Sequence, residues 1–518
     1  MNILFYVKGK GDAHLAHALA LYLLREWSNA RFFAVVYRDS GEGHYLRKMA
    51  GDLFKDFISE SMMYREAEEQ NFVVSEVELK RLDAMYGAPT LWQYITHDRW
   101  LSMTRKGYLF EYGTTRSRQE LLCHIQTRFL MTEAFIDRVK PNLIIYAGVD
   151  VGPSSALILY HIAHARNIPV LVPMHTRVAS YMTISDTVYS QLTAIESAYQ
   201  IIQKQEFAES HTRQQGREML QLFRSGRLKP SYMYRIIKDI EQKDAPPLPE
   251  IVSRNESSSG FKNALNRLRT NWGRPTSSDP LYTPFWKRRY DNVVMQARQF
   301  SIKRSKNFQL PEPGERYIYY PLHVEPELSL LLYAPYWTNQ YPVVQNIAQS
   351  LPQGVCLYVK EHPALLGSRP LSYYDRMSKI PNVRLISPFV DSHKMIRQSE
   401  GIVTITGTVG LEAILMGKPV ITFGDVYYNF FDKGVWHTHS YESLPEIVKC
   451  FEEFTPDEDA IINFLTAVLD NSVAVDWRSL IIGLLQVPAN QAEENPTFVR
   501  YASFLKRRAE VVMGDIAR

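Results

Sequence analysis

The sequence predicts an α/β protein made of two Rossmann-like halves with helical insertions. The first observation is a strand, a glycine loop and a helix at the start of the chain. The second is a series of short apolar runs after residue 317 that alternate with helical segments. Such alternation is typical of a parallel sheet whose strands are joined by helices. The length agrees, because 518 residues are enough for two to four domains with a substantial core.

The composition limits the class of protein. Hydrophobic residues make up 45% of the chain and charged residues 22%, which is ordinary for a soluble globular protein. The net charge of +4 is small for this length, so we expect no nucleic-acid partner. Cys123, Cys356 and Cys450 are far apart and form no CxxC motif. They indicate reduced thiols rather than a disulfide framework or a zinc site.

We expect a cytoplasmic protein that can associate with the inner face of the membrane. The apolar run Ile3–Val7 is too short for a signal peptide and lacks a basic segment before it. No stretch of 18 or more apolar residues exists, so the sequence predicts no transmembrane helix. Two basic segments with aromatic residues, 262–274 and Trp286–Arg289, are candidates for contact with anionic lipid. A solvated helix face is the alternative for both.

The first half opens with a buried strand, Asn2–Val7, followed by a loop and the helical run Leu15–Trp27. The loop is not GxGxxG, so dinucleotide binding is not indicated. The next strand is Arg31–Tyr37, after which residues 55–140 read as a largely helical, polar insertion. Further on, the pattern predicts a strand, a helix, a second strand, more helices and a linker: Asn142–Ala147, Ser154–Arg166, Pro169–Val172, 183–243 and 244–279.

The second half begins at Tyr317 and ends with a helix, Pro496–Val512. Its predicted strands are Tyr317–Tyr320, Val355–Val359, Val383–Ile386, Ile402–Ile405 and Pro419–Phe423. We therefore divide the chain into an N-terminal domain, a C-terminal domain and a final segment: 1–290, 291–485 and 486–518.

The most informative stretch reads strand, tight turn, helix and strand, IVTITGTVGLEAILMGKPVITFGD. Thr406, Gly407 and Thr408 turn the chain into the helix. A helix that begins at the end of a parallel strand offers free backbone N–H groups to an anion, and the two threonine hydroxyls lie at that end. Helix capping is the alternative for them. Glu412 lies one turn further on, where its carboxylate suits the hydroxyls of a ribose better than a phosphate.

A second motif, Lys360-Glu361-His362-Pro363, follows an apolar strand earlier in the chain. Pro363 fixes the turn and biases His362 toward an extended conformation. His362, beside Lys360, can then donate a hydrogen bond to a phosphate. A simple turn with a solvated lysine is the alternative. Since open α/β sheets bind ligands at the carboxyl ends of their strands, we expect both motifs to form one site.

Three segments resemble the capsular polysaccharide biosynthesis family: HVEPELSLL (323–331), KEHP (360–363) and TGTVGLEAILMGKPVITFG (406–424). Its members are GT-B glycosyltransferases, among them the Kdo transferases of capsule export. The resemblance implies a GT-B fold, in which two Rossmann-like domains face a central cleft. The N-terminal domain would bind the acceptor and the C-terminal domain the donor, while the final segment would pack back on the N-terminal domain.

The resemblance also implies the reaction, which is transfer of Kdo or a sialic-acid-like sugar from a CMP-activated donor to a glycan or lipid-linked glycan. The donor is a co-substrate, so we expect no resident cofactor. We recognise no metal-binding DxD pattern in the second half, so we expect no metal, and protein groups would neutralise the donor phosphate. The alternatives are a CDP-glycerol-type glycerophosphotransferase, which the TGTVGLE helix start disfavours, a UDP-sugar glycosyltransferase and a non-catalytic capsule assembly or export protein.

The catalytic base is expected in the first domain, near the acceptor hydroxyl. Asp150 lies in a glycine turn after a predicted strand, and Asp98 lies next to an arginine that would keep it ionised. Asp12 and His14 in the first loop are further candidates. A structural role is the alternative for each of them.

Three more charged residues are candidate ligands of the substrates. Glu325 and Glu327 lie in a segment that borders the donor site in the family, where either could contact the donor sugar or cap the following helix. Arg177 follows a predicted strand and could bind an acidic group of donor or acceptor, with a surface arginine as the alternative.

Overall fold

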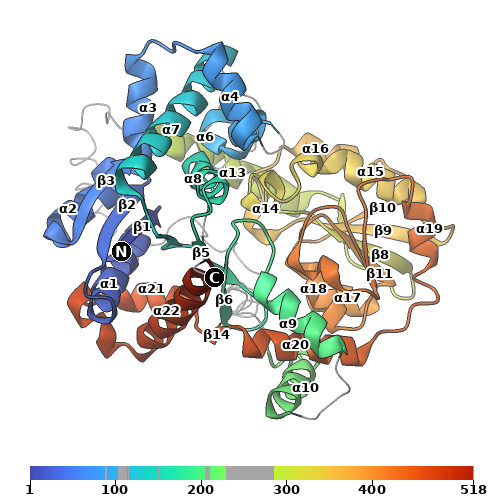
Figure 1. The fold of residues 1–518 in the computed structure, drawn as a ribbon. Helices are drawn as coiled ribbons and strands as arrows, with labels where there is room; N and C mark the ends of the chain where they lie inside the picture. The colour runs from blue at the N-terminus through green and yellow to red at the C-terminus, as the bar shows by residue number, and fades with distance from the viewer. Residues whose placement is uncertain are drawn as a thin grey trace, which may run out of the picture.

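The computed structural model describes residues 1–87, 90–102, 114, 116–149, 151–204, 210–228 and 285–516. Within these ranges the chain forms two α/β units, each built on a seven-stranded sheet (Figure 1). The first unit is blue and cyan in Figure 1, and the second is yellow and orange. The predicted class, α/β with two largely parallel sheets, is confirmed. In the part of the chain that the structure describes, no helix is long and apolar enough to cross a membrane.

The first sheet has the strand order β14-β6-β5-β4-β1-β2-β3. Neighbours from β5 to β3 pair in parallel, whereas β6 and β14 are antiparallel additions at one edge. The strands are β1 (Asn2–Val7), β2 (Arg31–Val36), β3 (Phe54–Ser59), β4 (Leu143–Tyr146), β5 (Val170–His175), β6 (Tyr181–Ser185) and β14 (Val473–Ala474).

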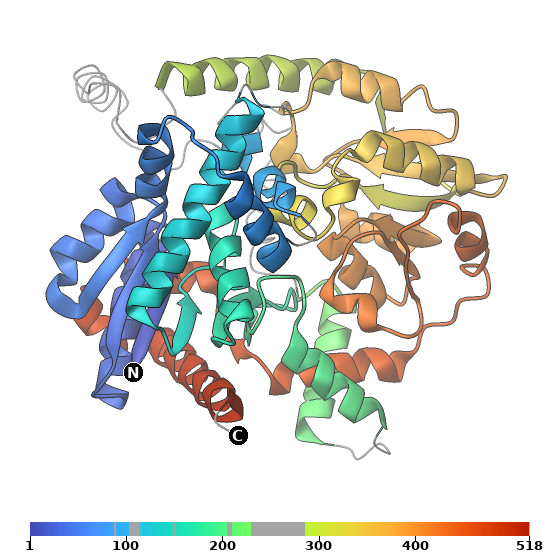
Figure 2. The same ribbon diagram turned by 45° about the horizontal axis from the view of Figure 1, so that its top comes forward.

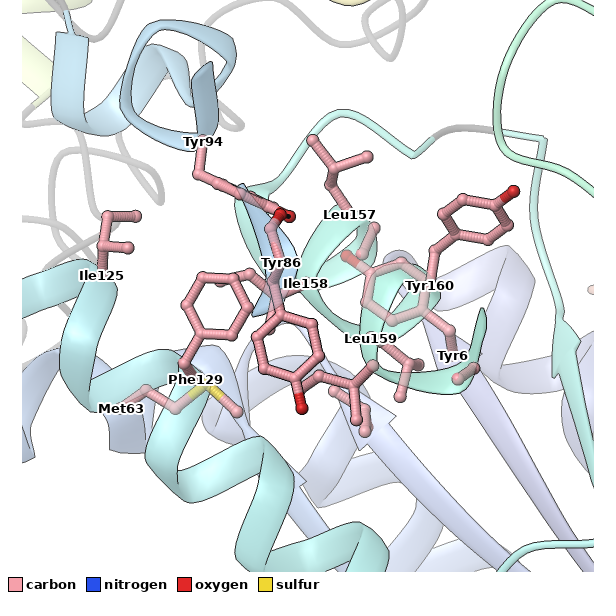
Figure 3. Packing of buried hydrophobic residues seen from close by; sticks show 14 of the residues in the cluster. Tyr6, Met63, Tyr86, Tyr94, Ile125, Phe129, Leu157, Ile158, Leu159 and Tyr160 are labelled. Carbon is pink, nitrogen blue, oxygen red and sulfur yellow. Dashed lines mark hydrogen bonds between the residues drawn. The ribbon is translucent and has the colours of Figure 1, made fainter. Parts of the chain in front are cut away.

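Eight helices of the first unit precede β5 among the described residues. They are α1 (Lys10–Glu26), α2 (His44–Met49), α3 (Glu60–Glu69), α4 (Glu76–Tyr86), α5 (Trp92–His97), α6 (Arg99–Ser102), α7 (Arg118–Val139) and α8 (Ser154–Ala165). Aromatic packing joins several of them (Figure 3). The rings of Tyr86 and Phe129 stack at 5.2 Å, and Tyr94 meets Phe129 edge-on, so α4, α5 and α7 share one core.

One part of the predicted helical insertion is wrong. Residues 54–59 form β3, which pairs in parallel with β2, instead of joining the helices. The sequence FKDFIS hides this strand, because Lys55 and Asp56 interrupt the apolar pattern. Lys55 is exposed at the sheet edge, while Ile58 and Ser59 are buried. An edge strand needs only one apolar face, which a short polar run does not reveal.

The second sheet is parallel throughout, with the order β13-β12-β11-β8-β9-β10-β7. Its strands are β7 (Phe308–Gln309), β8 (Arg316–Pro321), β9 (Val355–Lys360), β10 (Val383–Ile386), β11 (Gly401–Thr404), β12 (Val420–Thr422) and β13 (Val435–His437). The five predicted strands are confirmed to within a residue or two. Their apolar runs are continuous because helices cover both faces of the sheet.

Helices join these strands and follow them. They are α13 (Phe285–Arg304), α14 (Leu328–Leu331), α15 (Gln340–Ser350), α16 (Leu371–Met377), α17 (Ser392–Gln398), α18 (Thr408–Leu415), α19 (Leu444–Lys449) and α20 (Glu458–Asp470). Figure 2 shows α13 along the top of the molecule, in yellow-green.

The chain crosses between the units more than once. α9 (Thr193–Lys204) and α10 (His211–Arg224) follow the first sheet but pack on α20 of the second unit. α21 (Trp477–Leu484) and α22 (Pro496–Ile516) return to the first unit, where Phe498, Tyr501 and Leu505 join its core. Figure 1 shows these red helices beside α1. The domain boundaries stay a prediction, since the units exchange segments in space.

Candidate donor site

The candidate site lies where the strand order of the second sheet reverses. β8 is central, with β9 on one side and β11 on the other, while the chain reaches β11 only after β10. Such a switch point leaves a crevice at the carboxyl ends of the strands. His323 follows β8, Lys360 ends β9, and Thr406 follows β11. The structure therefore brings the KEHP motif and the TGTVGLE motif to the ends of β9 and β11, the two strands that flank β8.

His323 is a residue of this site whose role the sequence did not reveal. Its Nε2 atom accepts a hydrogen bond from the backbone N–H of Thr406 at 3.0 Å and lies 3.2 Å from the hydroxyl of Thr404. Burial lowers the pKa of His323 to about 3, so the ring is neutral. The sequence feature that could have identified His323 is its position as the first polar residue after β8.

The turn before α18 is tightly packed. The backbone N–H of Gly407 donates to the hydroxyl of Thr404 at 3.0 Å. A Cβ atom on Gly407 would lie 2.6 Å from that oxygen and 3.3 Å from Nε2 of His323, so the turn leaves no room for a side chain. The hydroxyl of Thr406 donates to the carbonyl of Ser329 at 3.0 Å. These contacts fix the direction in which α18 begins.

Thr408 is the first residue of α18 and is half-buried. Within the described ranges its hydroxyl makes no hydrogen bond, in contrast to that of Thr406. The first backbone N–H groups of a helix have no partner inside the helix and carry its positive dipole end. Of the two predicted hydroxyls, Thr408 is thus the one available to an anion.

Lys360 is buried at the end of β9. Its Nζ atom donates to the hydroxyl of Ser392, the first residue of α17, at 2.7 Å. Burial lowers the pKa of Lys360 to about 8, and the charges of Asp391 and Glu412 oppose this shift. At pH 7 the ammonium group is therefore charged in a poorly solvated place, which is the condition for strong attraction to a phosphate.

Glu412 points from α18 toward α17. Its Oε2 atom lies 3.5 Å from Nε2 of His393, and both side chains are buried. Neither atom has a hydrogen-bond partner among the described residues. Glu412 also lines a small hollow with Arg177, which extends from the loop after β5 in the first unit. The carboxylate of Glu412 thus keeps acceptor capacity beside a cation from the other unit.

Local backbone contacts fix the His-Pro turn. The backbone N–H of His362 donates to Oε1 of Glu361 at 2.7 Å, and Pro363 begins a short 3₁₀ turn, Pro363–Leu365. Burial lowers the pKa of His362; the charge of Glu361 opposes this shift, while Lys360 and Arg369 add to it. His362 itself is partly exposed, in contrast to Glu361.

A buried charge cluster lies beneath the loops that follow β8 and β9. Arg369 donates to Glu361 and to the carbonyl of His323, the latter at 2.7 Å. Its guanidinium also lies 3.5 Å from Glu325, whose carboxylate accepts a hydrogen bond from Gln340. Glu325 is therefore engaged inside the protein, which favours a positioning role over contact with a sugar. Glu327 accepts a hydrogen bond from Ser329 at 3.1 Å and precedes α14.

In the first unit, Asp98 belongs to a second buried cluster. Its Oδ2 atom accepts a hydrogen bond from the hydroxyl of Ser154 at 2.9 Å and lies 3.7 Å from Arg128. Arg128 also lies 3.3 Å from Glu60, which accepts a hydrogen bond from Ser155. Burial raises the pKa of Glu60 to about 7, although Arg128 opposes the shift. Asp98 is completely buried, so an acceptor hydroxyl has no access to it in this conformation.

Asp12 and His14 lie near the switch point of the first sheet, between β1 and β4. Asp150 falls outside the described residues. Asp12 lies against Gly148, where a Cβ atom would collide with its carboxylate. His14 is bound by the carbonyl of Val487 and the hydroxyl of Tyr45, both at 2.9 Å, which indicates a structural role.

Comparison with known proteins supports the resemblance for the part of the chain that holds this site. Residues 279–440 match the family model described as capsule polysaccharide biosynthesis protein. Protein FixF of Sinorhizobium fredii is 34% identical over 128 residues, which are 23% of this chain and 29% of that protein. Capsule polysaccharide modification protein LipA of Neisseria meningitidis is 28% identical over 72 residues, 14% of this chain and 10% of that protein. The matches thus span less than a third of either relative, and the predicted resemblance is confirmed over the matched range.

Solved structures with a similar course of the chain include two Kdo transferases. The β-Kdo 2,4 transferase of Thermosulfurimonas dismutans KpsC has a TM-score of 0.36 and 13% identity, covering 67% of this chain and 87% of that one. The β-Kdo 2,7 transferase of the same protein has a TM-score of 0.31 and 12% identity, covering 73% and 92%. The UDP-GlcNAc 2-epimerase of Methanocaldococcus jannaschii has a TM-score of 0.24 and 10% identity, covering 91% and 98%. At these scores the neighbours carry no argument about reaction or substrate.

Proposed function

We propose that this protein is a glycosyltransferase of capsular or related surface-polysaccharide synthesis. The observation that carries the proposal is the placement of Lys360, His362 and the start of α18 at the carboxyl ends of the two strands that flank β8. A buried cation, a partly exposed imidazole and a helix terminus together suit a phosphate group. The match to the capsule family covers all three elements.

The donor phosphate lies between Lys360 and the hydroxyl of Thr408 in this proposal. Charge that develops on the leaving phosphate is stabilised by groups already fixed in place, so no reorganisation is needed during the reaction. Ser392 holds the ammonium of Lys360, and His323 holds the turn before α18. Transfer proceeds without a metal in this scheme, because protein groups supply the positive charge.

The nucleoside and the sugar extend from that phosphate toward Glu412 and Arg177. Oε2 of Glu412 is buried 3.5 Å from Nε2 of His393 and has no hydrogen-bond partner among the described residues. In this proposal the carboxylate turns toward the ligand and accepts hydrogen bonds from ribose hydroxyls. The guanidinium of Arg177, which lines the same hollow, pairs with the carboxylate of an acidic sugar such as Kdo. A CMP-activated donor fits this charge pattern, since one phosphate needs only one buried ammonium group.

The acceptor, a glycan or lipid-linked glycan, binds the first unit in this proposal. Asp98 or Asp150 serves as the base, and for Asp98 a rearrangement of the cluster around Arg128 must first give access. Domain closure is the step that would cause this rearrangement.

Peripheral membrane binding through α13 accompanies the proposal, because lipid-linked acceptors lie at the membrane. Trp286, Tyr290, Val293 and Phe300 are 71%, 55%, 64% and 56% exposed and lie at helical spacing. Exposed cations flank this apolar face near the end of the helix, Lys303 and Arg304. Such a face suits the headgroup region of an anionic bilayer.

Calorimetric titration with CMP, CDP, UDP and GDP tests the proposal. We expect CMP to bind most tightly, and Lys360→Met and His362→Ala to weaken it at least about tenfold. Lys394→Met is the matched control, because Lys394 is an exposed lysine on α17, two residues from Ser392. A preference for UDP or GDP would overturn the CMP donor but keep the nucleotide site. Absence of binding for every nucleotide would remove the donor site and favour a non-catalytic role.

A further inference from the structure

We propose that Asp425, His437 and His439 form a binding site for a divalent transition-metal ion, with Zn²⁺ as the reference case. One ligand atom of each residue lies within 4.8 Å of the other two. Two imidazoles and one carboxylate are the donor set that zinc, cobalt and nickel prefer. A DxD pattern does not include this set, because Asp425 and the histidines are far apart in the sequence.

The backbone places the three side chains without strain. His437 ends β13 and pairs in register with Thr422 of β12. His439 follows two residues later at a bend, and its ring meets that of His437 edge-on. Asp425 lies in the loop after β12, and its backbone N–H donates to the carbonyl of Tyr333 at 2.9 Å. All three residues thus meet at the carboxyl edge of the second sheet.

Hydrogen bonds also fix the ring state of His437. Asn429 donates through Nδ2 to the carbonyl of Gly424 at 3.0 Å, so its Oδ1 atom faces Thr422 and accepts that hydroxyl's proton at 2.8 Å. The oxygen of Thr422 is then left to accept from Nδ1 of His437, 3.2 Å away. The proton is therefore on Nδ1, and Nε2 presents a lone pair. Metal-binding histidines are oriented in the same way by a partner on the other nitrogen.

That lone pair faces a carboxylate oxygen, so a metal ion or a proton is needed between the two atoms. Nε2 of His437 lies 3.5 Å from Oδ1 of Asp425, and the ring of His439 meets that of His437 edge-on at 4.5 Å. A neutral imidazole lone pair and a carboxylate oxygen repel each other. A bound metal ion removes this repulsion and uses both atoms. Protonation of Nε2 is the competing solution, because Nδ1 would keep its bond to Thr422 while Nε2 would donate to Asp425.

The site is open and separate from the proposed phosphate site. All three residues are exposed, so a bound ion keeps positions for water or another ligand. Gly424, next to Asp425, packs against the side chain of Thr406, where a Cβ atom would collide. The metal site therefore adjoins the loop before α18, but its ligands are distinct from the residues proposed to hold the donor.

Titration of the full-length, tag-free protein with Co²⁺ tests the inference, since bound Co²⁺ shows visible absorption that reports its ligands. We expect one Co²⁺ per chain, displaced by Zn²⁺, and at least about tenfold weaker binding in His439→Ala and Asp425→Asn. His211→Ala is the control, because His211 is an exposed histidine on α10. Circular dichroism verifies that each variant is folded.

Equal Co²⁺ affinity in His439→Ala, His211→Ala and wild type would overturn the inference, as would the absence of saturable binding in the wild type. Nucleotide binding is measured on the same samples without metal. Loss of the metal signal alone in His439→Ala supports a site independent of the donor, so failure of the donor proposal and failure of this one remain distinguishable.

Discussion

Nε2 of His323 accepts a hydrogen bond from the backbone N–H of Thr406 at 3.0 Å. The bond joins the loop after β8 to the loop after β11, which lie on the two neighbouring central strands of the second sheet. It requires an unprotonated ring nitrogen, and burial supplies that state by lowering the pKa of His323 to about 3. The geometry of the proposed phosphate site therefore depends on a neutral histidine that is not itself proposed to touch the phosphate.

Acid should destabilise the protein through this residue. The pKa of His323 is about 3 in the folded state and near 6.5 when unfolded, so the unfolded chain binds more protons between these values. The contribution of His323 is complete above pH 6.5 and is lost as the pH falls toward 3. Denaturant titrations at pH 7.5 and 5 should show a smaller loss of stability for His323→Gln than for wild type. An equal loss of stability between pH 7.5 and 5 in His323→Gln and in wild type would contradict this prediction. His211→Gln is the control.

Removal of Arg369 should be strongly destabilising. Its guanidinium is completely buried with Glu361 and Glu325, and Arg369→Met leaves both carboxylates without their cation. We expect a loss of roughly 3–5 kcal/mol in the free energy of unfolding. The double variant Arg369→Met/Glu361→Gln should lose less than the sum of the single changes. Arg316→Met, which removes exposed ion pairs with Glu400 and Glu452, should cost far less in the same denaturant titrations.

A methyl group at position 407 should disturb the turn before α18. The Cβ atom of Gly407→Ala would lie 2.6 Å from Oγ1 of Thr404, so either the hydrogen bond to Gly407 or the one to His323 must lengthen. We expect nucleotide affinity to fall at least about tenfold while circular dichroism stays unchanged, because the strands are not touched. Gly514→Ala is the control, since nothing lies within 4 Å of the added atom. Equal affinity in both variants would argue that the turn does not form the phosphate site.

Nucleotide affinity should depend on pH through Lys360. Its pKa is about 8, and only the charged form attracts a phosphate, so affinity for CMP should fall as the pH rises from 7 to 9. The second ionisation of a phosphate monoester lies near pH 6 and is complete in this range. Calorimetry on Lys360→Met should show weak binding without the pH dependence. The same slope in the variant would assign the dependence to another group.

The exposed face of α13 should bind anionic vesicles. Trp286 and Phe300 lie on it, and the guanidinium of Arg304 covers the ring of Phe300 at 3.8 Å. Co-sedimentation with vesicles containing phosphatidylserine should fall several-fold in Trp286→Ser/Phe300→Ser and at high salt. Tyr336→Ser is the control, because Tyr336 is 79% exposed outside this helix. Equal binding by all three proteins would remove α13 as a membrane contact. The basic segment 262–274 lies outside the described residues.

The strands of the second sheet could be predicted because each is a short run of apolar residues buried on both faces. The motifs could be placed at their carboxyl ends because KEHP and TGT follow such runs directly. The partners of those motifs could not be predicted in the same way. Arg369 and Ser392 are polar residues in loops or at helix starts, and only the folded chain brings them to Glu361 and Lys360.

A periodic pattern of apolar residues does not predict which polar residues are buried or what they contact. Asp98 was expected beside the acceptor because its neighbour is an arginine, whereas the structure pairs it with Arg128 from α7 and Ser154 from α8. β14 could not be predicted either, because a two-residue strand has no periodic pattern. It forms because β6 offers an open edge.

The return of the chain to the first unit has a consequence for synthesis on the ribosome. Phe498, Tyr501 and Leu505 cover the apolar side of α1, and β14 covers the edge strand β6. Some 290 residues separate β6 from β14, so the first sheet is made long before its covering segments leave the ribosome. Until then an apolar helix face and a strand edge are open to other chains. The first unit can therefore bury these surfaces only after residues 473–505 have been synthesised.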